Sequence, residues 1–390
     1  MDIDFESKGF LLDPHETYDK IFASQTVFYS QKYGTWIFAD FATVKLALSD
    51  DENFAYNKKI KPSGIQQSRS GKLLANWILN QTEEDHKTFK RIIGTFFSSS
   101  AVGRLELYMQ EETRKICDGF NEQEIDLADV YGNFFPMKLM TKILGLREVD
   151  FDVIKKASRM AEHYAYFPNT DKDKKIFEFA VFTLEKFVIN ILENNHYSDD
   201  GLIHHLASFY KNGEITLDEL VSNTILFVIA AIETTSYSLN NALMLLLKYP
   251  EQRALFLQNS DKANQYIDEL MRFESSASYA RRFAVKDFDV EGHSIKKGDL
   301  VLLLLNAANR DPLVYTEPNE FNLEREYIKN LAFGHGVHVC LGLHLAKMEI
   351  KVATTYLLNR YPNCTLIPET IQWTDRFGFR GIVKMNVKLN

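Results

Sequence analysis

Cysteine is scarce in this 390-residue chain, which contains only Cys117, Cys340 and Cys364. Their spacing matches neither a disulfide framework nor a paired-cysteine zinc motif. A disulfide-stabilised secreted domain and a cysteine-rich metal module are therefore both disfavoured. We expect the protein to be cytoplasmic, in a reducing compartment.

Long apolar runs and an excess of basic residues are also missing. Residues 1–6 are acidic, unlike a signal or transit peptide. The apolar run 225–232 is well short of the ~18 residues that suggest a membrane span, so we expect no membrane anchor. The formal net charge of -8 disfavours a nucleic-acid partner, because such binding depends on Lys and Arg contacts with phosphate.

No linker rich in Pro, Gly or Ser, no low-complexity tract and no repeat divides the chain. Apolar residues make up 45% of the sequence and charged residues 25%, which is typical of a globular protein. We therefore predict a single domain over residues 1–390, large enough to enclose an internal cavity.

The strongest secondary-structure signal is a helix over residues 217–248. Thr216 and Glu219 have the spacing of a capping box at its start, and Tyr249-Pro250 ends it. Residues 225–232 are apolar on every side of this helix. A helix with that pattern is buried, so we expect it to run through the centre of the molecule.

The rest of the chain alternates between helical and strand-like patterns. Helical periodicity extends over about 83–195 and returns at about 341–360. Strand patterns cover 26–30, 35–40, 287–290 and 300–305, with Gly34 as the turn between the first two. The predicted fold class is mainly α with a smaller β portion.

The densest chemical signal is the loop 333–342, which places a cysteine next to a predicted helix. Gly334 and Gly336 allow the backbone to turn tightly. Because a helix N-terminus favours negative charge, we expect it to lower the pKa of the Cys340 thiol. A single sulfur fits the axial position of a haem, whose porphyrin supplies the in-plane ligands. The alternative is that Cys340 is a small buried residue on a glycine-containing turn.

This loop resembles the haem-binding signature of the cytochrome P450 superfamily, Phe-Gly-x-Gly-x-His/Arg-x-Cys-x-Gly. The matching residues are Phe333, Gly334, Gly336, His338, Cys340 and Gly342. The resemblance covers about residues 35–382 and implies the fold of a soluble bacterial P450, with a long central helix over haem b (iron protoporphyrin IX). It also implies that Cys340 ligates the iron and that Phe333 and Ala230 contact the cofactor.

Residues 230–235 resemble the oxygen-activating segment of the same family. The resemblance implies that Glu233 and Thr234 are catalytic and relay protons. Ala231 stands where the family usually has glycine, which implies a narrower groove. Thr234 can also bond back to the carbonyl of Ala230 and bend the helix, and both readings can hold.

Haem propionates need cations, and the resemblance implies four of them. His86 and Lys90 are four residues apart on one predicted helix, and Arg282 and His338 match two further positions. Lys90 stands where arginine is common, so it keeps the charge but loses bidentate geometry. Ser276 stands where the family usually has proline, so the resemblance does not predict the backbone path of residues 275–279.

Glu269 and Arg272 match the family's Glu-x-x-Arg pair, and Arg325 matches the third member of that network. A pair at this spacing on a helix is by itself an ordinary surface contact. The resemblance instead implies a structural network behind the haem, with no part in catalysis.

The resemblance implies a monooxygenase that inserts one oxygen atom from O2 into a small apolar organic substrate, by hydroxylation or epoxidation, in secondary metabolism. The sequence has no flavin or nicotinamide fingerprint, so electrons are expected from a separate ferredoxin or flavodoxin. Lys87, Arg91, Lys347 and Lys351 are either its docking face or scattered solubilising cations. Two alternatives are a peroxide-driven or redox-neutral haem-thiolate enzyme and a non-catalytic haem sensor.

Four segments are predicted by alignment to line the substrate pocket: 56–80, 164–167, 275–279 and 377–379. Aromatic residues recur in them, which favours an apolar substrate. Three nearby lysines are either contacts for a carboxylate or carrier protein or part of a solvated loop: Lys58, Lys59 and Lys61.

Overall fold

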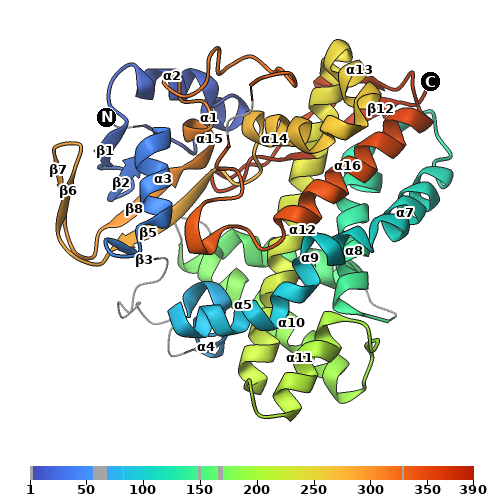
Figure 1. Ribbon diagram of the computed structural model, residues 1–390, viewed down its shortest axis with the longest axis horizontal. Coiled ribbons are helices and arrows are strands. Elements are labelled where there is room, and N and C mark those ends of the chain that lie inside the picture. Colours follow the sequence, from blue (N-terminus) through green and yellow to red (C-terminus); the bar gives the residue numbers. More distant parts are fainter. Residues whose placement is uncertain (1–2, 56–67, 82, 148–150, 166–169, 327–328) are drawn as a thin grey trace. The chain divides into compact units, whose positions relative to one another are not determined.

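A computed structural model describes residues 3–55, 68–81, 83–147, 151–165, 170–326 and 329–390 (Figure 1). These residues form two compact units, each described separately below. The first comprises 1–58, 106–132 and 234–390, and the second comprises 59–105 and 133–233. The structure is 58% helical, which confirms a mainly α fold with a smaller β portion. The assignment of the whole chain to one domain stays a prediction.

A five-stranded sheet organises the first unit, in the order β1-β2-β8-β5-β3. Its strands are β1 (Val27–Ser30), β2 (Thr35–Phe38), β8 (Leu300–Leu304), β5 (Tyr279–Ala284) and β3 (Phe54–Ala55). The β2–β8 pair is parallel, and the other pairs are antiparallel. The sheet packs against helix α3 (Phe41–Ser49) through buried side chains such as Phe38, Val44 and Leu303. The strands predicted at 26–30, 35–40 and 300–305 are confirmed, with small differences at their ends.

Helices and shorter strand pairs complete the first unit. Its other helices are α1 (Lys8–Leu12), α2 (His15–Phe22), α7 (Glu106–Asp118), α13 (Pro250–Gln258), α14 (Ala263–Phe273), α15 (Leu305–Ala308) and α16 (Leu343–Arg360). Its other strands are β4 (Glu124–Asp126), β6 (Phe288–Val290), β7 (His293–Ile295), β9 (Thr365–Leu366), β10 (Gln372–Trp373), β11 (Ile382–Lys384) and β12 (Asn386–Lys388). The strand predicted at 287–290 is therefore confirmed as β6.

The described part of the second unit is helical. Its helices are α4 (Arg69–Ala75), α5 (Glu83–Phe97), α6 (Ser99–Gly103), α8 (Phe134–Leu144), α9 (Phe151–Ala165), α10 (Asp171–Glu193) and α11 (Leu202–Lys211). The helical prediction for 83–195 thus holds for most of its length, with β4 of the first unit as an exception.

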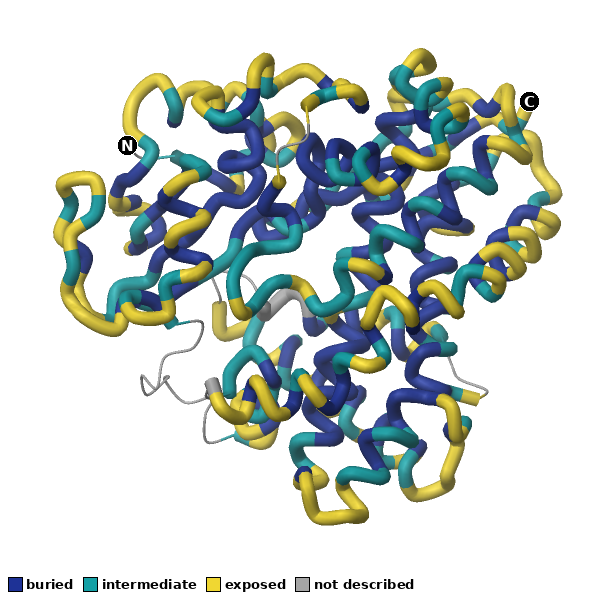
Figure 2. The backbone as a smooth tube through the Cα atoms, viewed as in Figure 1, coloured by how far each residue is buried: buried dark blue, intermediate teal, exposed yellow. Residues whose placement is uncertain are grey.

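Helix α12 (Leu217–Lys248) has the predicted bounds and contributes residues to both units. The Thr216 hydroxyl accepts a hydrogen bond from the Glu219 N–H at 3.2 Å, and the Glu219 carboxylate accepts one from the Thr216 N–H at 2.7 Å. Among the described helices, α12 is the one long and apolar enough to cross a membrane, but 83% of its apolar window is buried inside the protein (Figure 2). That burial is typical of a core helix in a soluble fold.

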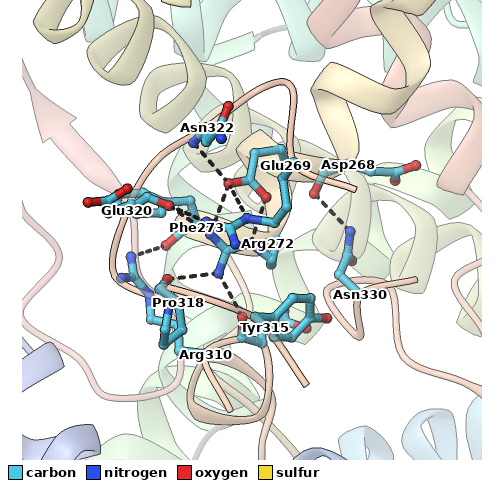
Figure 3. A network of polar contacts seen from close by, with 12 residues as sticks. Asp268, Glu269, Arg272, Phe273, Arg310, Tyr315, Pro318, Glu320, Asn322 and Asn330 are labelled. Carbon is cyan, nitrogen blue, oxygen red and sulfur yellow. Dashed lines mark hydrogen bonds and ion pairs between the residues drawn. The ribbon is translucent and has the colours of Figure 1, made fainter. Parts of the chain in front are cut away.

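A buried network joins helix α14 to the loop that follows α15 (Figure 3). The Arg272 guanidinium donates to both carboxylate oxygens of Glu269, at 2.6 and 2.9 Å. It also donates to the carbonyls of Asn309 and Pro318, at 2.9 and 3.0 Å. Arg325 donates to the Glu269 carboxylate at 3.2 Å, so the predicted contacts among Glu269, Arg272 and Arg325 are confirmed.

We predict that Arg272→Met lowers the free energy of unfolding by about 3–5 kcal/mol, because it leaves the buried Glu269 carboxylate without its main partner. Urea denaturation measures this loss. The control is Arg114→Met, which breaks an ion pair with Asp118 whose side chains are about half exposed. It is expected to cost less than about 1 kcal/mol. Equal losses in the two variants would contradict the prediction.

Candidate functional site

The loop that carries Cys340 is closed by its own backbone. The Cys340 N–H donates to the Phe333 carbonyl at 2.9 Å, and the short helix η5 (Gly336–His338) lies between them. Gly334 and Gly336 have φ angles of +71° and +75°, in the left-handed region that favours glycine. Helix α16 begins at Leu343, two residues later than predicted.

The carbonyl oxygen of Leu48 in α3 has neighbours from both the cysteine loop and strand β5. A Cβ atom on Gly336 would lie 2.8 Å from that oxygen, so only glycine fits without a shift. The Arg282 guanidinium on β5 donates to the same oxygen at 3.5 Å. The structure therefore brings Phe333, His338, Cys340 and Arg282 into one region of the first unit.

The environment of the Cys340 sulfur differs from the sequence-based expectation. Burial raises the pKa of the thiol, and a hydrogen bond from the Gly342 backbone lowers it only in part. Desolvation therefore outweighs that hydrogen bond. The residue as a whole is exposed, although protein surrounds its sulfur.

These features fit a haem held by one sulfur. Among the described residues, no group of three or more His, Cys, Asp or Glu side chains could hold a bare metal ion. A lone sulfur that receives an N–H hydrogen bond is suited to a metal whose other ligands come from a prosthetic group. The nearby Arg282 guanidinium is a cation of the kind that a propionate requires.

A carboxylate is buried in the middle of α12. Glu233 is 2% exposed, and its Oε1 lies 3.5 Å from Nε of Arg159 on α9, a side chain that is 42% exposed. The preceding Ala230 is exposed, although residues 226–229 before it are buried, and Ala231 and Thr234 are half-buried. The Thr234 carbonyl accepts a hydrogen bond from the Ser238 hydroxyl at 2.8 Å. The helix thus presents an accessible surface near a buried acid and a half-buried alcohol.

The family model "Cytochrome P450" matches residues 137–375 of this chain. The chain belongs to the cytochrome P450 family. It is 28% identical to the biotin biosynthesis cytochrome P450 of Bacillus subtilis (strain 168), over 98% of this chain and 97% of that protein. It is 27% identical to the epothilone C/D epoxidase of Sorangium cellulosum, over 98% of this chain and 93% of that protein.

Solved structures agree with this assignment. P450BioI in complex with an acyl carrier protein ligated to hexadec-9Z-enoic acid has a TM-score of 0.88 at 25% identity, covering 98% of this chain and 100% of that one. Epothilone B-bound P450epoK has a TM-score of 0.88 at 25% identity, covering 100% of both chains. This P450 is therefore an oxidoreductase of the monooxygenase class, and its family uses haem iron.

The cationic residues predicted for the propionates lie on two units of this P450. Arg282 and His338 belong to the first unit, whereas His86 and Lys90 lie on α5 of the second. His86 is buried and Lys90 is half-buried. Four-residue spacing on a helix puts both side chains on one face of α5. Their shared role stays a prediction.

Two features of the site were missed by sequence reasoning. Arg159 lies 74 positions before Glu233, and no local pattern on α9 distinguishes it from other surface cations. The path of residues 275–279 is also fixed by distant partners. The Ser278 N–H donates to the Gly378 carbonyl at 3.1 Å, and the Arg380 N–H donates to the Ser276 carbonyl at 2.8 Å. Two predicted lining segments, 275–279 and 377–379, are therefore neighbours.

The proposed docking lysines are not equivalent. Lys347 is mostly buried and forms an ion pair with Asp268 at 2.5 Å, so it joins α16 to α14 and is not a free surface cation. The Nζ of Lys351 lies 4.0 Å from Glu106, whereas Lys87 and Arg91 are exposed on α5. Lys58, Lys59, Lys61 and the lining segment 164–167 lie outside the residues whose side chains the structure describes.

We predict that Gly336→Ala destabilises this P450 more than Gly334→Ala. Both substitutions force alanine into a left-handed conformation, at about 1–2 kcal/mol each. At Gly336 the new Cβ also meets the Leu48 carbonyl at 2.8 Å, whereas at Gly334 the nearest atom is 3.9 Å away. Urea denaturation compares the two variants. A larger loss at Gly334 would mean that the contact with Leu48 does not shape the loop.

Proposed function

We propose that this P450 is a cytoplasmic haem-thiolate monooxygenase that inserts one oxygen atom from O2 into a small apolar organic substrate, by hydroxylation or epoxidation. The observation that carries the proposal is the closed loop around Cys340, an exposed residue whose shielded sulfur receives a hydrogen bond from the Gly342 backbone. Cys340 is the proposed iron ligand. Bound haem would supply the oxygen-activating redox chemistry, which electron donation by a thiolate favours.

The cofactor in this proposal is haem b. Arg282, His338, His86 and Lys90 are the proposed partners of its propionates, and Phe333 and Ala230 pack against it. The buried position of Arg282 beside the cysteine loop supports this assignment, because a buried guanidinium favours an anionic partner. The accessible surface at Ala230 supports contact between α12 and the cofactor.

Glu233 and Thr234 are the proposed proton-relay residues. A carboxylate buried in an apolar helix is costly unless a cation compensates its charge, and Arg159 supplies that cation. The Arg159 side chain is 42% exposed, so the cation of this ion pair meets solvent while the acid is buried. This arrangement favours O2-driven chemistry over the peroxide-driven, redox-neutral and sensor alternatives, which have less need for a proton path.

Two relatives support a role in secondary metabolism, the epothilone C/D epoxidase of Sorangium cellulosum and the polyketide biosynthesis cytochrome P450 PksS of Bacillus subtilis. The proposed electron donor is a separate ferredoxin or flavodoxin. Lys87 and Arg91 are candidates for its docking because both are exposed, whereas the Lys347 side chain is mostly buried. The complex of P450BioI with an acyl carrier protein makes a carrier-bound substrate the second candidate.

We predict that the reduced, haem-loaded protein gives a carbon monoxide difference spectrum with a strongly red-shifted Soret band, and that Cys340→Ala abolishes it. Thiolate ligation is the physical cause of that shift. Cys364→Ala is the control, because this cysteine is buried elsewhere in the first unit. A red-shifted band that survives in Cys340→Ala, or that is lost in the control, would refute the assignment of Cys340.

We predict that Glu233→Gln and Thr234→Ala each lower the yield of oxidised product per electron pair by at least about tenfold, since positioned acid–base groups contribute on the order of 10²–10⁴ to rates. Product and consumed reductant are measured together with a ferredoxin system. The control is Thr224→Ala on the same helix, whose hydroxyl bonds to the Leu220 carbonyl at 2.9 Å. Unchanged coupling in both relay variants would exclude the proposed relay.

A further inference from the structure

Three aromatic rings surround Phe377 in the turn between β10 and β11. Phe5 stacks on it with ring centroids 4.6 Å apart and planes 7° from parallel. Phe10 meets it edge-on at 5.7 Å, and Tyr279 lies at 4.7 Å. Contacts of this kind stabilise a structure beyond what the buried area alone contributes. Two of the three rings, those of Phe5 and Phe10, come from residues 3–12, called the N-terminal segment below. This segment is far from Phe377 in the sequence.

The neighbouring residue Phe379 is held from a different direction. Its ring lies 5.8 Å from Tyr237 on α12, and its backbone forms a bridge with Ala277. The Ser278 N–H donates to Gly378 between these two phenylalanines. The turn is therefore attached to α12 and Ala277 at Phe379, and to β5 and the N-terminal segment at Phe377.

Arg380 ties the same turn to the end of α1. Its guanidinium donates to the carbonyls of Leu11 and Leu12, at 3.1 and 3.4 Å, where a helix end leaves acceptors unpaired. It also donates to the buried Glu274 carboxylate at 2.6 Å. Burial alone would raise the pKa of Glu274, but Arg380 and His15 lower it well below the usual range. The contacts of Arg380 with the end of α1 and with Glu274 thus hold the C-terminal end of the turn in place.

The side chains between the N-terminal segment and the turn do not fill all of the space there. A cavity of about 10 Å³ lies between the N-terminal segment and the turn, about the size of one water molecule. Phe10, Tyr18, Ser278, Phe377 and Arg380 are among its lining residues. Because Phe377 borders this space on one side, the position of its side chain rests on its ring contacts with Phe5, Phe10 and Tyr279.

We infer that Phe5 and Phe10 are positioning residues that set the substrate selectivity of this P450 by holding Phe377 in place. This inference rests on the proposed function and on the sequence-based prediction that 377–379 lines the substrate pocket. Phe5 is fully buried and takes no part in binding substrate itself. It acts through Phe377, so a change at Phe5 alters the shape of the pocket while iron ligation stays intact.

Hydrogen exchange tests the coupling without any ligand. In Phe5→Leu, amides of residues 374–382 are expected to exchange at least threefold faster than in the wild type, with Phe10→Leu as a second variant should the first fail to fold. The matched control is Phe28→Leu, a buried phenylalanine of β1 that makes no ring contact within the part of the chain that the structure describes. Equal exchange at 374–382 in all of these proteins would overturn the inference.

A binding experiment tests the effect on the pocket. The probes are imidazole, which reports the iron, and 4-phenylimidazole, whose ring also occupies space above it. The ratio of their dissociation constants is expected to change at least threefold in Phe377→Leu and in Phe5→Leu, but not in Phe28→Leu. A change in Phe377→Leu alone would overturn the role of Phe5. No change in Phe377→Leu would instead show that 377–379 does not line the pocket, which overturns that prediction and the inference with it but leaves the proposed function standing.

Discussion

The buried ion pair between Glu269 and Arg272 determines where the cysteine loop begins. Arg272 binds the Asn309 carbonyl, and the Asn309 side chain in turn accepts a hydrogen bond from the Leu331 N–H at 2.7 Å. Leu331 lies two residues before Phe333, whose carbonyl closes the loop onto Cys340. A short chain of hydrogen bonds therefore leads from α14 to the proposed iron ligand. The charges are buried at a cost, and the gain is a fixed starting point for a segment with little regular structure.

Glu233 and Cys340 both carry ionisable groups that burial would keep neutral. The two residues differ in whether a nearby cation compensates a negative charge. Glu233 is almost completely buried but lies near Arg159, so its charge is compensated within the second unit. The Cys340 thiol has an N–H donor but no cation among the groups that influence its pKa, so desolvation prevails. A thiolate in such a place is stable when a metal takes the place of its proton. The loop is thus better suited to a bound metal centre than to a free reactive cysteine.

Sequence reasoning succeeded where the signal is local. The bounds of α12 follow from a capping box and a Tyr-Pro stop, and its burial follows from the uniform apolar run at its centre. The loop around Cys340 is recognisable from residues within one turn of chain. Arg159, the pairing of Ser278 with Gly378 and the ion pair of Lys347 with Asp268 depend on contacts between distant segments, which no periodicity encodes. The pKa of Cys340 was misjudged for the same reason, since burial is a property of the tertiary structure.

The aromatic cluster around Phe377 holds one turn in place with side chains from distant segments of the chain. Phe5 and Phe377 are separated by almost the whole chain, so their contact depends on the fold of the first unit, which brings both segments together. Closing so long a loop has an entropic cost that grows slowly with length, and stacking together with the Arg380 anchor offsets it. Phe5 contacts the turn through Phe377. Apolar substitutions at Phe5 can therefore change the shape of the turn without adding a polar group to an apolar surface. The N-terminal segment is therefore a place where specificity can change while the cysteine loop and α12 keep their structures.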